Sequence, residues 1–191
     1  MSYETETLKL LKQSLDEEDD ETNVISVLEH HHKYLREYMS ILTSTDIAPE
    51  HKQATLSLFL PIFNMYAKAE RDTFYRLLKD SSNHDVRMEA LRGMDEHEIA
   101  FEIIRELTDM GAETAWSEEI DAKIRVLAAI VRSHIKEEET VMYPMAEKNF
   151  TEARLINLTD DYLKKCKMYL DMEMESVPSA VSRSDVLTFF Y

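Results

Sequence analysis

Four long segments of the chain carry apolar residues at helical spacing, and a titratable side chain interrupts each apolar stripe near its middle. The segments cover about 23–44, 48–80, 83–110 and 117–148. The sequence holds only 2 Gly and 4 Pro, so few residues would break these helices. Four amphipathic helices with short connections pack around a common core. The sequence therefore predicts an all-α protein, an antiparallel up-down four-helix bundle with titratable groups at its centre.

Residues with strong capping preferences mark where these helices begin and end. Ser, Thr and Asn at a helix start, Pro in the first turn and Gly after the last turn are typical of helix boundaries. The sequence offers Thr22 or Asn23, Pro49, Asn83 and Trp116–Ser117 as starts, and Gly111 as a stop.

The rest of the chain divides into three pieces outside the bundle, which we place at 22–150. Residues 1–21 hold a short amphipathic piece followed by an acidic run. Residues 151–175 form a further amphipathic stretch, predicted to be an extra C-terminal helix. The tail, 176–191, ends in three aromatic residues, and we expect it to contact a partner protein or a second copy of the chain.

Charge and composition narrow the possible partners. The net charge of −16 argues against binding nucleic acid or an anionic membrane surface. No apolar run approaches the roughly 18–20 residues that a membrane helix needs, and the first residues lack the pattern of a secretion signal. The single cysteine, Cys166, excludes a cysteine-built metal site. We expect a cytoplasmic protein.

The stretch SHIKEEETVMYP, residues 133–144, carries the clearest chemical signal. His134 and Glu138 lie four residues apart, so both side chains fall on the same face of a helix as the apolar stripe. Burying an imidazole and a carboxylate is costly unless a partner neutralises them. Histidine nitrogen and carboxylate oxygen are good ligands for a transition metal ion.

The other three stripes are interrupted in the same way, by His31, Glu70 and His97. One such interruption is common, whereas one in each helix at similar depth is not, because buried polar groups without partners are rare. Three imidazoles and two carboxylates would form a metal site. Two ions fit better than one, since a pair of carboxylates can bridge them. His30 and His32 lie near the edges of the first stripe, about 100° to either side of His31.

The run HIKEEETVMYP resembles the H-x-x-x-E-E-x-x-x-[FY]-P signature of hemerythrin-like (HHE cation-binding) domains, and the helix order agrees over residues 23 to about 148. The resemblance implies a four-helix bundle that holds two iron ions joined by an oxo or hydroxo bridge. Carried over by position, it implies that Glu70 and Glu138 are the bridging carboxylates. The implied metal ligands are His31, Glu70, His97, His134 and Glu138.

The second helix departs from the family pattern. Tyr66 occupies the position of a family histidine, and Arg76 replaces the signature proline. Tyr66 could bind iron as tyrosinate or lie beside the metal, and we include it among the metal-site residues. It could also indicate an open position, a single-metal site or a lapsed site. As a further alternative, His32 or His30 could supply a ligand in place of the missing family histidine.

At the level of function, the resemblance implies a non-haem di-iron protein that senses or reacts with oxygen, nitric oxide or peroxide, or that handles iron. Any catalysis would be weak redox activity at an exchangeable coordination position. The alternative is a regulatory or interaction bundle whose metal site is structural, mononuclear or lapsed.

Overall fold

The computed structural model describes residues 23–176, and all regular secondary structure in that range is helical. This confirms the predicted all-α bundle with an additional C-terminal helix. Two of the four rods of the bundle are single helices, and the other two contain a short π-helical segment. The elements of the bundle are α2 (Val24–Thr43), α3 (Pro49–Glu70), η1 (Arg71–Tyr75), α4 (Arg76–Lys79), α5 (His84–Asp109), α6 (Glu118–Glu137), η2 (Glu138–Met142) and α7 (Tyr143–Asn149).

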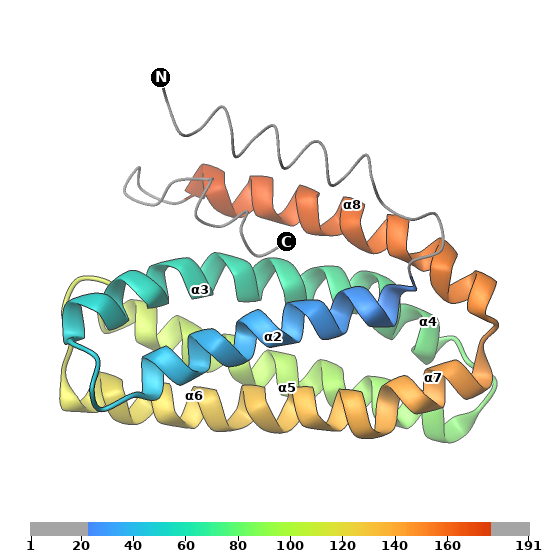
Figure 1. The fold of residues 1–191 in the computed structure, drawn as a ribbon, viewed down its shortest axis with the longest axis horizontal. Helices are drawn as coiled ribbons and strands as arrows, with labels where there is room; N and C mark the ends of the chain where they lie inside the picture. The colour runs from blue at the N-terminus through green and yellow to red at the C-terminus, as the bar shows by residue number, and fades with distance from the viewer. Residues whose placement is uncertain (1–22, 177–191) are drawn as a thin grey trace.

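The four rods run along the long axis of the molecule (Figure 1). Helix α2 contacts both α3 and α6, and α5 contacts α6 and the end of the second rod. The fifth helix, α8 (Glu152–Ser176), lies outside this bundle and packs chiefly along α3, with further contacts to α2. The apolar stripes meet in one continuous core between these helices.

The predicted helix boundaries are confirmed by the capping contacts. The Asn23 side chain accepts a hydrogen bond from the Ile25 amide (2.9 Å), and Asn83 and Ser117 cap α5 and α6 in the same way. Pro49 is the first residue of α3. Gly111 follows α5 with a φ of 70°, the left-handed conformation that glycine adopts most readily.

Helix α8 buries Leu155, Tyr162, Cys166 and Leu170 against the bundle. Cys166 is fully buried, and this burial raises the pKa of its thiol, which keeps it protonated and unreactive. The extra helix therefore completes the core on the α3 side.

The predicted acidic N-terminal segment and the aromatic tail lie outside the described residues. Between residues 23 and 176, no helix combines the length and apolar character that crossing a bilayer requires.

Candidate metal centre

Four of the predicted site residues converge in the middle of the bundle. Glu70 ends α3, His97 lies in the middle of α5, His134 lies in the last turn of α6, and Glu138 begins η2. Each is buried, and each offers a ligand atom within 4.8 Å of the others. These four residues, far apart in the sequence, therefore lie at one depth in the core.

Two of these residues have polar atoms that no side chain or backbone group between residues 23 and 176 satisfies. Both carboxylate oxygens of Glu70 and both ring nitrogens of His97 are buried, and none has a hydrogen-bond partner within the described part of the chain. Glu70 Oε2 lies 3.6 Å from His97 Nε2, too far for a hydrogen bond. Leaving such groups unsatisfied costs on the order of 1–3 kcal/mol each. A cation bound between the carboxylate and the imidazole would satisfy both, so these residues fit a metal ion.

The charges of the centre are strongly coupled. Burial and the neighbouring Glu138 raise the pKa of Glu70 well above its usual value. Burial alone would raise the pKa of Glu138, but the imidazoles of His134 and His32 hold it well below its usual range. Burial and His134 lower the pKa of His97, which keeps that imidazole neutral, the form that binds metal. Without a cation, burial and the neighbouring charges therefore favour the neutral form of Glu70 and the ionised form of Glu138.

The two histidines that face Glu138 are oriented by carboxylates behind them. His134 Nδ1 lies 2.6 Å from Glu96 Oε2, and His32 Nδ1 lies 2.9 Å from Glu139 Oε1. These contacts direct Nε2 of each ring toward the centre. A carboxylate behind a histidine is the arrangement that fixes the orientation of metal-binding imidazoles.

Burial disfavours the charged form of His134, but the neighbouring Glu138 and Glu96 outweigh this effect and raise the pKa of His134 to about 9. The His134 ring is therefore protonated at neutral pH while no metal is bound, and a metal ion would replace that proton.

Both carboxylates lie where an α-helix changes to a π-helix. Glu70 immediately precedes η1, and Glu138 is the first residue of η2. In a regular α-helix a residue five positions on points about 140° away, at 100° per residue. A π turn contains one residue more than an α turn, so the fifth residue comes round to nearly the same face. Tyr75 and Tyr143 consequently join Glu70 and Glu138 at the centre.

Glu138 faces a different set of partners with each oxygen. Its Oε1 accepts a hydrogen bond from the Tyr75 hydroxyl and lies 3.3 Å from His134 Nε2. Its Oε2 lies 3.1 Å from His32 Nε2 and accepts a hydrogen bond from the Tyr66 hydroxyl at 3.2 Å. The carboxylate thus spans two groups of side chains, as a bridging ligand would.

On the Oε2 side the polar groups already have partners. His32 Nε2 lies 2.7 Å from the Tyr66 hydroxyl and 3.2 Å from the Tyr143 hydroxyl. Burial and the charge of Glu138 raise the pKa of Tyr66 well above its usual value, so without a metal the phenol is a proton donor. Tyr66 therefore lies at the centre, hydrogen-bonded to both Glu138 and His32.

The three consecutive histidines of α2 have three different environments. His31 is buried, and its Nδ1 lies 2.7 Å from the Tyr162 hydroxyl of α8, outside the group of four. His32 is buried and faces Glu138, as described above. His30 is only partly buried, and its ring packs edge-on against Tyr34. Of the three, the structure thus places His32 against Glu138, and not His31, the expected α2 ligand.

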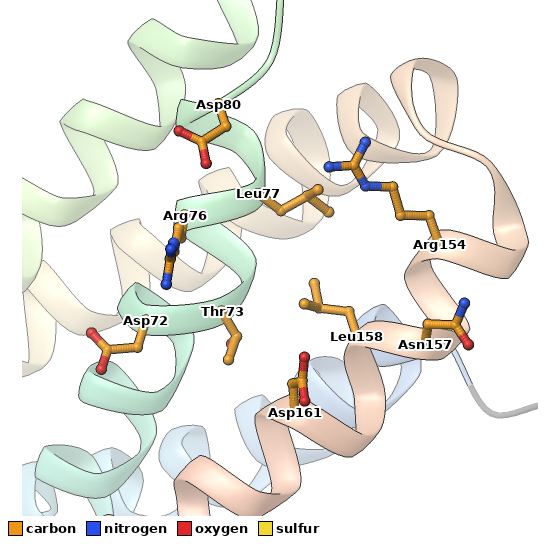
Figure 2. A pocket seen from close by; sticks show the side chains of 9 residues that line it. All are labelled: Asp72, Thr73, Arg76, Leu77, Asp80, Arg154, Asn157, Leu158 and Asp161. Atoms are coloured by element: carbon orange, nitrogen blue, oxygen red, sulfur yellow. The ribbon is translucent and has the colours of Figure 1, made fainter.

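A surface cavity of about 340 Å³ lies nearby, between the second rod and the start of α8 (Figure 2). It is open to solvent and none of its lining residues belongs to the centre. The lining residues are Asp72, Thr73, Arg76, Leu77, Asp80, Arg154, Asn157, Leu158 and Asp161.

The fold and the centre together define a class: helical bundles that hold a metal ion in their core with histidine and carboxylate ligands. Residues 23–146 match the hemerythrin HHE cation-binding domain, and the chain belongs to that family. No curated protein and no solved structure matches the chain. Family membership supports the binding of a cation at the buried histidine–glutamate group.

Proposed function

We propose that the protein is a non-haem iron protein with two iron ions in its bundle core, and that it senses or reacts with oxygen, nitric oxide or peroxide. The observation that carries this proposal is the pair of buried, unpartnered residues, Glu70 and His97, beside His134 and Glu138. Protein cores rarely leave four such polar atoms without partners. The match to a cation-binding domain supports a metal as the missing partner.

The two oxygens of Glu138 support a site with two positions. On one side, Glu70, His97 and His134 would hold an ion with the Oε1 atom of Glu138. On the other side, His32 and Tyr66 would hold a second ion with the Oε2 atom. Bound iron would supply redox chemistry and an exchangeable coordination position for a small ligand.

The side chains of the protein would orient and insulate this centre. Glu96 and Glu139 fix the rings of His134 and His32, while the aromatic rings of Phe63 and Tyr75 pack edge-on against His97. A dry, aromatic enclosure suits a small diatomic or peroxide ligand. The net charge of −16 favours such a ligand over nucleic acid, and the single cysteine is compatible with a cytoplasmic location.

The test is elemental analysis of protein prepared with added iron, together with its visible absorption spectrum before and after oxygen, nitric oxide or peroxide is added. We expect about two irons per chain by the two-position argument and a spectrum that changes with at least one ligand. Iron that binds without any spectral response would contradict the sensing or reactive role.

The second candidate is a regulatory bundle whose metal is single or structural. The hydrogen bonds that already satisfy His32, Tyr66 and Tyr143 favour it, because that side needs no ion. One metal per chain, or no metal and a melting temperature unchanged by chelator, would support this candidate over the first.

A further inference from the structure

Gly93 is an unusual residue for its position, in the interior of the long helix α5. A glycine there destabilises a helix by roughly 1 kcal/mol relative to alanine, and α5 continues through it without a break. The reason is space. A Cβ atom at position 93 would lie 2.5 Å from the Tyr75 hydroxyl oxygen and 2.8 Å from Cζ of the same ring. Any larger residue would therefore collide with Tyr75.

The space left by Gly93 is what allows the Tyr75 hydroxyl to reach the metal centre. The Tyr75 side chain is fully buried, and its ring packs edge-on against His97 with centroids 5.4 Å apart. Its hydroxyl donates a hydrogen bond to Glu138 Oε1 and lies 3.3 Å from His134 Nε2. A phenol enclosed in this way could yield to a side chain at position 93 only by moving its hydroxyl away from Glu138.

We propose that Tyr75 is a positioning residue of the metal centre, which holds the Glu138 carboxylate at His134 through its hydroxyl, and that position 93 is glycine to admit that hydroxyl. The inference rests on the proposed metal-binding function. It assigns Tyr75 a role different from that of Tyr66, which contacts the other oxygen of Glu138. Tyr75 acts through the carboxylate that it restrains.

The test is the binding of Co²⁺, a spectroscopic probe for histidine and carboxylate sites, by the full chain and its Tyr75→Phe variant. Removing a group that orients a ligand typically weakens metal binding 10- to 100-fold. We expect about a tenfold weaker Co²⁺ affinity and an altered visible spectrum of the bound ion, because the geometry of Glu138 changes. Equal affinities and identical spectra would overturn the proposal.

Tyr169→Phe is the matched control. The Tyr169 hydroxyl also donates to a carboxylate, that of Asp72, but away from the centre. This variant should bind Co²⁺ like the unmodified protein. If both variants weakened binding equally, the effect of Tyr75→Phe would not be specific to Glu138, and the proposal would be wrong. If the unmodified protein bound neither Co²⁺ nor iron, the proposed function itself would fail, a result distinct from equal binding by the variants.

Gly93→Ala tests the second half of the proposal. We expect it to lower both the melting temperature and the Co²⁺ affinity, because the new methyl group displaces the phenol. In a Tyr75→Leu background the collision disappears, so adding Gly93→Ala should no longer lower the melting temperature, while Co²⁺ binding stays weak. A Gly93→Ala protein as stable and as tight-binding as the original would contradict the role of Gly93.

Discussion

The two sides of Glu138 differ in how their buried polar groups are satisfied. We call the side with Glu70, His97 and His134 the histidine side, and the side with His32, Tyr66 and Tyr143 the tyrosine side. On the histidine side, Glu70 and His97 have no hydrogen-bond partner among the described residues. On the tyrosine side, His32 Nε2 has the two hydroxyls and Glu138 within 3.2 Å, and His32 Nδ1 lies 2.9 Å from Glu139.

This difference indicates which side of Glu138 would gain more from a bound ion. A metal on the histidine side would displace no hydrogen bond of Glu70 or His97, so the full desolvation cost of those groups is available to favour binding. A metal on the tyrosine side would first have to break contacts that the protein already makes. The histidine side should therefore fill first and bind more tightly.

The largest effect is expected from removing a residue shared by the two sides. Glu138→Ala, or His134→Ala on the histidine side, should release bound metal and lower the free energy of unfolding by about 3–5 kcal/mol, because a buried charge loses its partner. Metal content and chemical denaturation measure both. His51→Ala and His84→Ala, which change exposed residues, should do neither. If all four variants behaved alike, the comparison between the two sides would lose its basis.

His97→Leu should separate metal binding from the stability of the protein without metal. Leucine has a similar size and removes an unsatisfied buried group, so the metal-free variant should be at least as stable as the original. The original protein should gain about 2.7 kcal/mol at a metal concentration 100 times the dissociation constant, and the variant should gain almost nothing. Thermal denaturation with and without metal measures this. A strongly destabilised metal-free variant would show that His97 has a structural partner.

Tyr66→Phe should have the opposite signature on the tyrosine side. It removes a hydrogen bond to His32 and one to Glu138, and should lower the stability of the metal-free protein by about 1–2 kcal/mol. In the iron-loaded protein, the phenolate-to-iron absorption band should disappear, which a visible spectrum records. If the original protein has no such band, Tyr66 is only a hydrogen-bond partner of the centre.

The smallest effect concerns a partly buried ion pair away from both sides. Lys52 is nearly inaccessible and lies 2.7 Å from Asp121, and the Lys52 ammonium helps to hold the pKa of that carboxyl below its usual value. The pair should stabilise the fold by about 1 kcal/mol above pH 4, and this contribution should vanish as the pH falls through the lowered pKa. Asp121→Asn should remove that pH dependence. Its metal content should be unchanged, which separates this pair from the centre.

Much of the fold and four members of the centre could be predicted because they depend on local spacing. Capping residues such as Asn23 and Asn83 act within a single turn, and an apolar stripe interrupted by Glu70 or His97 reveals a buried polar group whatever surrounds it. The sequence could not separate His31 from His32 in the same way. Helix α8 covers the α2 face that would otherwise meet solvent and buries His31 against Tyr162, while His32 is buried inside the bundle against Glu138.

The π segments could not be predicted from helical periodicity, because a count at the α-helical value gives no sign of an extra residue in a turn. With that count Tyr75 and Tyr143 point away from the carboxylates that precede them. Only the backbone of η1 and η2 shows that they face the centre. An i, i+5 pairing of a carboxylate with a tyrosine, found in both the second and the fourth rod, was the available signal.

In the two π segments, the number of residues matters as much as which residues they are. Deleting one residue from η1 would permit an unbroken α-helix, with every amide still hydrogen-bonded, and a chain of that kind would look well formed. It would also keep the phenol of Tyr75 on the core side, because a residue four positions after Glu70 in an α-helix lies only about 40° from it. If η1 instead became α-helical at its present length, the rest of the rod would turn by about 100° and the phenol would leave the core. A family member with a single-residue gap and a regular α-helix at this point would therefore keep the same interior, whereas one with the full length and a regular α-helix would have a rearranged interior.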